Sequence, residues 1–138
     1  MQQRLTIKNA QQTYRKQDVM TASPMELVLM LYDGIRKNIM LARRAIERKD
    51  IESAHDKLVR AYDIVMELIN CLDLSIPLSA ELLKIYEFML FALKEANFKK
   101  DAALLADVLE ISENLRSAWQ EVSTSVRDGM LDEAEEDV

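Results

Sequence analysis

The stretch TASPMELVLMLYDG, residues 21–34, joins a helix start signal to an unbroken apolar run. Ser23 can act as the N-cap, Pro24 takes the first helical position, and Glu26 follows three residues after the cap, which makes a capping box with proline where it is favoured. Beyond this stretch, apolar residues recur at spacings of three and four, the pattern of one helical stripe. The sequence therefore predicts a long first helix over about residues 24–49.

Gly34 lies inside this stripe, and the stripe passes through it without a change of phase. A glycine inside a helix costs about 1 kcal/mol relative to alanine. One interpretation is that another backbone comes close at this point, and the pattern alone leaves that open.

Three further apolar stripes predict three more helices. The second covers about residues 51–73, with Asp50 as its N-cap. A break at 73–77 precedes the third, which runs to about Phe98, and the fourth follows Asp101 as its cap and fades near Ser125. Only two glycines and two prolines occur in the chain, whereas sheet-rich folds need many more turn residues. The expected fold is all-α, an antiparallel up-and-down four-helix bundle.

The two ends of the chain differ in charge from the middle. Residues 1–23 are expected to form a flexible N-terminal segment, which could fold back as a lid or remain a disordered arm. Residues 24–126 form the bundle. Residues 127–138 hold six acids against Arg127 alone, which predicts a disordered acidic tail.

The composition indicates in which cellular compartment the protein is expected and which classes of partner are not expected. Cys71 is the single cysteine, and the first twenty residues contain no apolar stretch of secretory type. The longest apolar run, Leu27–Tyr32, is far shorter than the roughly 20 residues that span a bilayer. A cytoplasmic protein without stable membrane insertion is expected. Four basic residues within 1–16 are weak support for nucleic-acid binding, which is not expected.

Little in the sequence suggests catalysis. The pair Glu52 and His55 has the spacing of a di-iron ligand motif, but such sites need a second copy and the chain has one histidine. Cys71 lies on a helical stripe and fits a small core residue better than a nucleophile. No phosphate loop, nucleophile elbow or metal-ligand cluster is present. The expectation is a non-enzymatic protein with no catalytic residues, no metal and no cofactor.

The apolar content of two helices exceeds one stripe. Leu27–Tyr32 covers the whole circumference of its helix, and Phe88–Leu93 nearly does the same. Either these helices are central and buried on several sides, or they form a binding groove. Each large apolar side chain left in water forgoes about 1.5 to 3 kcal/mol, so an exposed row would need a cover. The eight methionines suit an adaptable groove.

Several blocks of the sequence, in order over residues 9–122, resemble the FliS family of flagellar export chaperones. One departure is Ile76-Pro77-Leu78-Ser79, where many members carry a Gly-Gly loop. The blocks are Tyr14, Val19-Met20-Thr21-Ala22-Ser23-Pro24, Leu27, Met30-Leu31-Tyr32-Asp33-Gly34, Lys57-Leu58, Ala61, Ile64, Glu67-Leu68, Ile85-Tyr86-Glu87-Phe88-Met89, Leu93, Glu95-Ala96-Asn97, Asp101, Leu115-Arg116 and Ala118-Trp119.

The resemblance implies a cytoplasmic chaperone that binds the disordered C-terminal segment of flagellin in hydrophobic grooves. It would prevent premature polymerisation and deliver flagellin to the flagellar type III export apparatus, with the export gate protein as a second partner and no nucleotide. A flexible client that folds as helices into grooves fits the apolar surplus. The alternatives are a helical oligomerisation module and a regulator that sequesters a helical partner.

The predicted site residues form two sets. The N-terminal lid or export-gate contact comprises Ile7, Tyr14 and Val19. Met30→Glu or Met89→Glu is expected to abolish client binding and leave the bundle folded. The predicted flagellin-binding groove comprises Leu27, Met30, Leu31, Ile35, Leu58, Tyr62, Val65, Tyr86, Met89 and Leu90.

Overall fold

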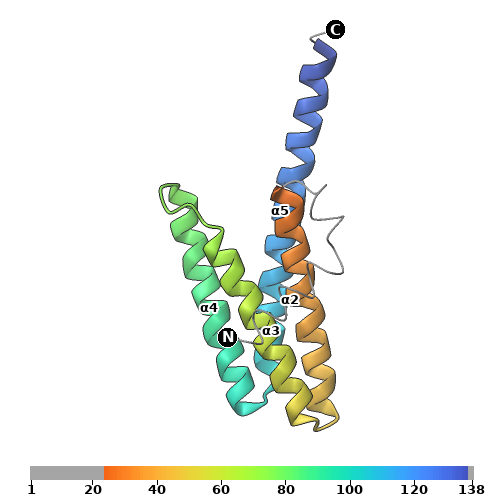
Figure 1. Cartoon of the computed structure of the whole chain (residues 1–138), viewed down its shortest axis with the longest axis vertical. Coiled ribbons are helices and arrows are strands. Elements are labelled where there is room, and N and C mark those ends of the chain that lie inside the picture. The colour runs from red at the N-terminus through yellow and green to blue at the C-terminus, as the bar shows by residue number, and fades with distance from the viewer. Residues whose placement is uncertain (1–23, 137–138) are drawn as a thin grey trace.

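The computed structural model describes residues 24–136, and its regular structure in that range is entirely helical. The four helices are α2 (Pro24–Glu47), α3 (Ile51–Asn70), α4 (Pro77–Lys99) and α5 (Ala102–Glu136). Each packs against two others, in the ring α2–α3–α4–α5. Successive helices run in opposite directions (Figure 1). The predicted all-α, four-helix fold is confirmed, while the segment 1–23 with Ile7, Tyr14 and Val19 lies outside the described residues.

Two short connections show why the chain turns where it does. Asp50 accepts a hydrogen bond from the backbone N–H three residues on, at 3.1 Å, so it is the predicted N-cap of α3. Asp101 accepts one from a backbone N–H at the start of α5 at 2.9 Å. Just before these caps, Lys49 and Lys100 have left-handed φ values of 60° and 51°. This conformation ends one helix and lets the chain reverse within a few residues.

The end of α5 differs from the prediction. A disordered tail was expected from residue 127, but the helix continues to Glu136. Alanine, leucine, methionine and glutamate in this stretch are good helix formers, and adding turns to an existing helix avoids the cost of nucleation. The last turns of α5 therefore extend beyond the other helices (Figure 1).

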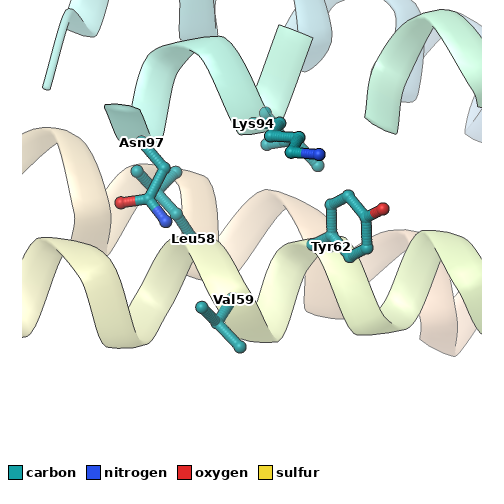
Figure 2. Close-up of a pocket in the computed structure, with 6 residues that line it drawn as sticks. Leu58, Val59, Tyr62, Lys94 and Asn97 are labelled. Atoms are coloured by element: carbon teal, nitrogen blue, oxygen red, sulfur yellow. The ribbon is translucent and has the colours of Figure 1, made fainter. Parts of the chain in front are cut away.

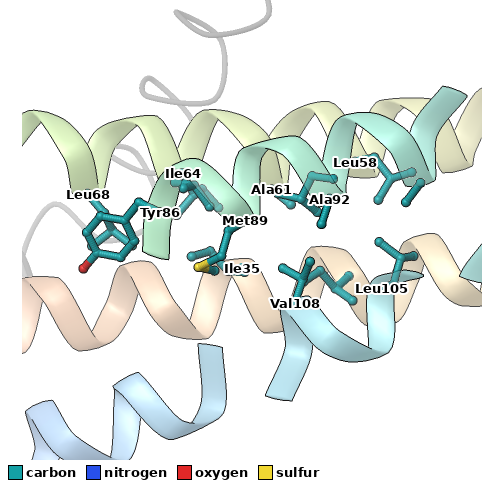
Figure 3. Close-up of a cluster of buried hydrophobic side chains, with 14 of the residues drawn as sticks. Ile35, Leu58, Ala61, Ile64, Leu68, Tyr86, Met89, Ala92, Leu105 and Val108 are labelled. Atoms are coloured by element: carbon teal, nitrogen blue, oxygen red, sulfur yellow. The ribbon is translucent and has the colours of Figure 1, made fainter. Parts of the chain in front are cut away.

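The core is one continuous cluster to which all four helices contribute (Figure 3). It occupies the inside of the ring, where stripes from facing helices interdigitate. Its buried members are Tyr32, Ile35, Ile39, Ala42, Leu58, Ala61, Ile64, Val65, Leu68, Leu82, Tyr86, Met89, Ala92, Leu93, Ala96, Leu105 and Val108.

Gly34 marks the close approach of α3 to α2. A Cβ atom added to Gly34 would lie 3.0 Å from Cδ1 of Ile64 and within 4 Å of no backbone atom of another helix. The interpretation that a second backbone approaches here is therefore wrong, because the neighbour is a side chain. An alanine at this position would push the tip of Ile64 by a few tenths of an ångström.

This geometry predicts a coupled pair of substitutions. Gly34→Ala should change the free energy of unfolding by less than about 1 kcal/mol, because the gain in helix propensity is offset by the displaced methyl group. Ile64→Val removes that methyl group, so Gly34→Ala in the Ile64→Val background should be stabilising by about 1 kcal/mol. Urea unfolding of the two single variants and the double variant measures the coupling. Strictly additive effects would contradict the contact.

Two tyrosines meet inside the bundle. The hydroxyl oxygens of Tyr32 on α2 and Tyr86 on α4 lie 2.6 Å apart, and both side chains are buried. Burial raises the pKa of both phenols. The hydrogen bond gives each buried hydroxyl a partner, which removes most of the penalty for placing it there.

Alkaline pH should therefore destabilise the protein through this pair. Because the folded pKa lies above the unfolded value of about 10, the stabilisation is complete below about pH 10 and is lost as the pH rises toward the folded pKa. Urea unfolding between about pH 9 and about pH 11 should show this loss, together with tyrosinate absorbance that appears only on unfolding. In the Tyr32→Phe/Tyr86→Phe variant that part of the pH dependence should disappear. An unchanged profile would count against the buried pair as its source.

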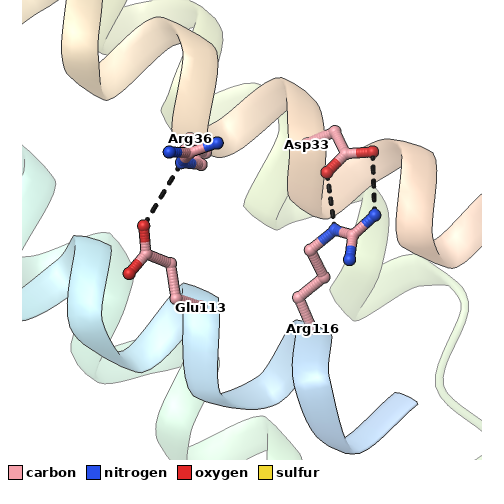
Figure 4. A network of polar contacts seen from close by, with 4 residues as sticks. All are labelled: Asp33, Arg36, Glu113 and Arg116. Atoms are coloured by element: carbon pink, nitrogen blue, oxygen red, sulfur yellow. Dashed lines mark hydrogen bonds and ion pairs between the residues drawn. The ribbon is translucent and has the colours of Figure 1, made fainter. Parts of the chain in front are cut away.

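Ion pairs join α2 to α5 on the outer surface (Figure 4). Asp33 accepts hydrogen bonds from Nε and Nη2 of Arg116 at 2.6 and 3.4 Å, and Arg36 lies 3.2 Å from Glu113. The bond to Asp33 raises the pKa of Arg116. Exposed pairs of this kind contribute about 0 to 1 kcal/mol each to stability. Their main effect is on the register of the two helices. Residues 32, 33 and 34 thus contact α4, α5 and α3 in turn.

Candidate functional site

The ten predicted groove residues divide by burial into two groups of five. Half-buried positions are Leu27, Met30, Leu31, Tyr62 and Leu90. The other five have at most 1% of their surface exposed and belong to the core: Ile35, Leu58, Val65, Tyr86 and Met89. Apart from Leu58, which lines a groove described below, these core residues have no surface to offer a partner. A stripe shows that a helix is amphipathic and does not identify its neighbour, so the sequence could not separate these core positions from the half-buried ones.

The two apolar runs differ in how far their side chains are buried. In the run Leu27–Tyr32 of α2, Leu29 and Tyr32 are buried, and the other four side chains are half-buried. In the run Phe88–Leu93 of α4, the inward positions join the core while Phe88 and Phe91 stay in solvent. The fully exposed apolar surface of these two runs therefore lies on α4.

All three phenylalanines of the chain are exposed on α4. Phe88 is 49%, Phe91 62% and Phe98 87% exposed. Their spacings of three and seven residues place them on one side of the helix, away from the core stripe of Met89, Leu93 and the residues in phase with them. We call these three residues the aromatic face of α4. Each forgoes about 1.5 to 3 kcal/mol of burial, so the face favours a partner that covers it.

A groove between α3 and α4 borders this face. Figure 2 shows it, with Leu58, Val59 and Tyr62 from α3 opposite residues of α4. Its volume is about 150 Å³. The α4 side is formed by Leu93, Lys94 and Asn97. We call this hollow the α3–α4 groove. Two predicted residues line it, Leu58 as part of its floor and Tyr62 on its wall.

The groove and the aromatic face form one surface. Lys94 lines the groove and lies three residues after Phe91 and four before Phe98, so all three share one flank of α4. The aliphatic part of a lysine side chain packs well on apolar groups while its ammonium stays in water. A helix laid along α4 could therefore contact the groove and the phenylalanines together.

Polar contacts fix one end of the groove. Asn97 Nδ2 lies 3.0 Å from His55 Nδ1, and Lys100 Nζ donates to Asn97 Oδ1 at 2.6 Å. His55 and Asn97 therefore connect α3 to α4 where the groove ends. Within residues 24–136, no group of three or more histidine, cysteine, aspartate or glutamate side chains could hold a metal ion.

Cys71 does not lie in the core as expected. It is exposed at the C-cap of α3. Partial burial of its thiol, with a smaller contribution from Glu67, raises the pKa of Cys71, so little thiolate is present at neutral pH. The surface around this turn is also apolar, since Leu74, Ile76 and Leu78 are all at least half exposed. None of the described helices is both long enough and apolar enough to cross a membrane.

Sequence reasoning missed the three phenylalanines as site residues. It identified the run 88–93 but chose Met89 and Leu90 from it, together with the nearby Tyr86. The available signal was that the phenylalanines share a phase of their own, distinct from the core stripe.

The family model described as "Flagellar protein FliS" matches residues 7–126. This chain belongs to the FliS family. It is 39% identical over 123 residues to the "Flagellar secretion chaperone FliS" of Bacillus subtilis, covering 89% of this chain and 92% of that protein. A protein of the same name from Vibrio cholerae is 31% identical over 117 residues, covering 80% and 86%.

A solved structure supports the fold. It is described as a flagellar chaperone from bacteria and superposes with a TM-score of 0.71 at 15% sequence identity, covering 86% of this chain and 98% of that one. The family resemblance predicted from the sequence is confirmed. In this FliS family member, the block Tyr32-Asp33-Gly34 that helped to carry the resemblance makes contacts between helices, so its part is structural.

Proposed function

We propose that this chain is a cytoplasmic export chaperone that binds the disordered C-terminal segment of flagellin. In this proposal it prevents premature polymerisation and delivers flagellin to the flagellar type III export apparatus, with the export gate protein as a second partner. Nucleic acid, stable membrane insertion and catalysis have no part in it. The observation that carries the proposal is the aromatic face of α4 beside the α3–α4 groove, in a chain whose named relatives are flagellar secretion chaperones.

The chemistry of this surface suits an amphipathic helix. An incoming helix would place apolar side chains at spacings of three and four against Phe91 and Phe98 and into the groove beside Tyr62. Part of the interaction free energy would be spent in ordering the client, so the complex would remain releasable. Release is required of a chaperone that hands its client to an export apparatus.

The half-buried positions of α2 are a second proposed contact. Leu27, Met30 and Leu31 lie in the first turns of α2 and retain partial exposure. A client longer than α4 could continue onto them. These three residues, Tyr62 and Leu90 are the five predicted groove residues whose side chains keep some exposed surface.

Titration with a peptide copying the C-terminal segment of the same organism's flagellin tests the proposal. Calorimetry should give a 1:1 complex, and circular dichroism should show a gain in helicity as the client folds. No binding at tens of micromolar concentration would contradict it. If the chain instead self-associates through the aromatic face, sedimentation of the protein alone would show a concentration-dependent dimer, which would favour the oligomerisation module. Binding of an unrelated amphipathic helix with equal affinity would favour a sequestering regulator.

The N-terminal segment is proposed to cover part of the groove when no client is bound, through Ile7, Tyr14 and Val19. Deleting residues 1–18 should then speed client association by about threefold or more, because no fraction of the molecules would have the groove covered by the segment. Stopped-flow mixing with the flagellin peptide measures this rate. Identical association rates for the truncated and full-length chains would argue against a lid.

A further inference from the structure

The single histidine of the chain, His55, lies on the side of α3 that faces α4. It precedes Val59 and Tyr62, which line the α3–α4 groove, by four and seven residues and so shares their side of the helix. The other neighbour, α2, packs on a different side of α3, where Ile64 meets Gly34. The groups across from the imidazole ring therefore belong to α4.

Three side chains form a chain of hydrogen bonds from the end of α4 to this ring. Lys100 Nζ donates to Asn97 Oδ1 at 2.6 Å and also to the backbone oxygen of Asn97. On the other side of the amide, Asn97 Nδ2 lies 3.0 Å from His55 Nδ1, and Asn97 Oδ1 is farther from that atom, at 3.3 Å. Figure 2 shows Asn97 pointing from α4 toward α3. The chain of bonds thus joins the two walls of the groove at one end.

The lysine fixes the direction of these bonds. An ammonium group has three donors and no acceptor, so the oxygen of the Asn97 amide must face Lys100. The amide nitrogen, which only donates, then faces His55. Nδ1 of His55 must therefore accept, which requires a neutral ring with its proton on Nε2.

Protonation of the ring removes this arrangement. A charged imidazole donates from both nitrogens, so Nδ1–H of His55 would meet the NH2 group of Asn97, donor against donor. Turning the amide by half a turn would satisfy the ring, but it would place the same NH2 group against the Lys100 ammonium. No orientation of the Asn97 amide satisfies both neighbours, and one of the two bonds is lost.

The charged groups around this pair balance one another. Glu52 precedes the ring by one turn on the same side of α3, and Lys94 precedes Asn97 by one turn on α4. Lys100 and Asp101 follow at the start of the connection to α5. Two acids thus stand against two bases, so the direction of the hydrogen bonds distinguishes the neutral ring from the charged one. Other charged side chains close in sequence form ion pairs of their own, Asp56 with Arg60 and Glu95 with Lys99.

We propose that His55 is a positioning residue of the α3–α4 groove: through Asn97 it ties α4 to α3 while its ring is neutral, and it releases α4 when the ring is protonated. An imidazole changes charge between about pH 8 and about pH 5. The tie is therefore present at the upper end of this range and lost at the lower end. Its effect on the client rests on the proposed function, because a released wall has to be ordered again when flagellin binds. The tie itself does not depend on flagellin.

A double-mutant cycle tests the tie in the protein alone. His55→Ala, Asn97→Ala and the double variant are unfolded in urea beside the unmodified chain, so that the contacts of each side chain with other neighbours cancel. At about pH 8 the pair should raise the folding equilibrium constant about threefold beyond the two single effects, and at about pH 5.5 this factor should fall to about one. An equal factor at both pH values, or no coupling at about pH 8, would overturn the proposal.

Two conservative substitutions change the donor pattern and should change the pH dependence in different ways. His55→Asn offers an amide oxygen near the position of Nδ1 and does not titrate, so its coupling to Asn97 should be the same at both pH values. Asn97→Asp replaces the NH2 donor by a second acceptor, which a charged His55 ring can use while the first oxygen still accepts from Lys100. Its coupling to His55 should therefore be larger at about pH 5.5 than at about pH 8. A coupling that is still larger at the higher pH would contradict the donor and acceptor assignment.

The effect on the client is a separate measurement. The flagellin peptide should bind the unmodified chain about threefold more weakly at about pH 5.5 than at about pH 8, and the His55→Asn chain should show no such difference. The same difference in both chains would show that other groups cause it, and His55 would have no positioning role in the groove. If the peptide binds neither chain at either pH, the proposed function fails while the double-mutant cycle still decides whether the tie exists.

Discussion

Phe91→Glu/Phe98→Glu should reduce the affinity for the flagellin C-terminal segment by about a hundredfold or more while the bundle stays folded. Each phenylalanine is mostly exposed, so the free protein loses no core contact when it is replaced. In the complex each should bury an apolar surface worth about 1.5 to 3 kcal/mol, and the two together account for the expected loss. Calorimetric titration gives the affinity, and circular dichroism confirms the fold.

The control for this variant adds the same charge elsewhere. Ser117→Glu/Gln120→Glu places two glutamates at exposed positions of α5. It should bind the flagellin segment as the unmodified chain does. Full-strength binding by the phenylalanine variant, or an equal loss in the control, would contradict the assignment of the aromatic face.

Met89→Glu should unfold the bundle or lower its stability by several kcal/mol. Met89 has no exposed surface and lies in the centre of the core (Figure 3). A carboxylate there would lose its hydration with no cationic partner in the core cluster. Thermal and urea unfolding followed by circular dichroism measure the loss. This expectation replaces the sequence-based one, in which Met89→Glu left the fold intact.

Two comparisons make this result specific. Met89→Leu keeps the volume and polarity of the site and should cost less than about 1.5 kcal/mol. Met30→Glu changes a half-buried residue of α2 and should remain folded. A folded Met89→Glu protein with native stability would show that Met89 is accessible and that the core is assigned incorrectly.

The fold followed from the sequence because its signals are local. Asp50 and Asp101 cap helices where predicted, and the apolar stripes mark both ends of α2, α3 and α4 and the start of α5 to within a few residues. Short connections then leave few arrangements other than an antiparallel bundle. The end of α5 lies later than expected, because the prediction weighed charge density above helix propensity and above the low cost of extending an existing helix.

The sequence predicted the site only in part, because the site depends on which helix each apolar stripe packs against. In α4 the run 88–93 is apolar on every side, so its sequence does not say which phase faces the core: that of Met89, which is buried, or that of Phe91, which is exposed. Packing against α3 and α5 makes that distinction. The groove has the same origin: Tyr62 was predicted from its stripe, but its partners Lys94 and Asn97 come from α4 and became visible only once the two helices were placed together.

The most direct test of the central claim is a map of the bound flagellin segment on this chain by backbone amide chemical shifts. On addition of the peptide, the largest changes should fall on the α3–α4 groove around residues 58–62 and on α4 from Phe88 to Phe98. Changes confined to the outer surface of α2 and α5, with α4 unaffected at saturation, would contradict the account.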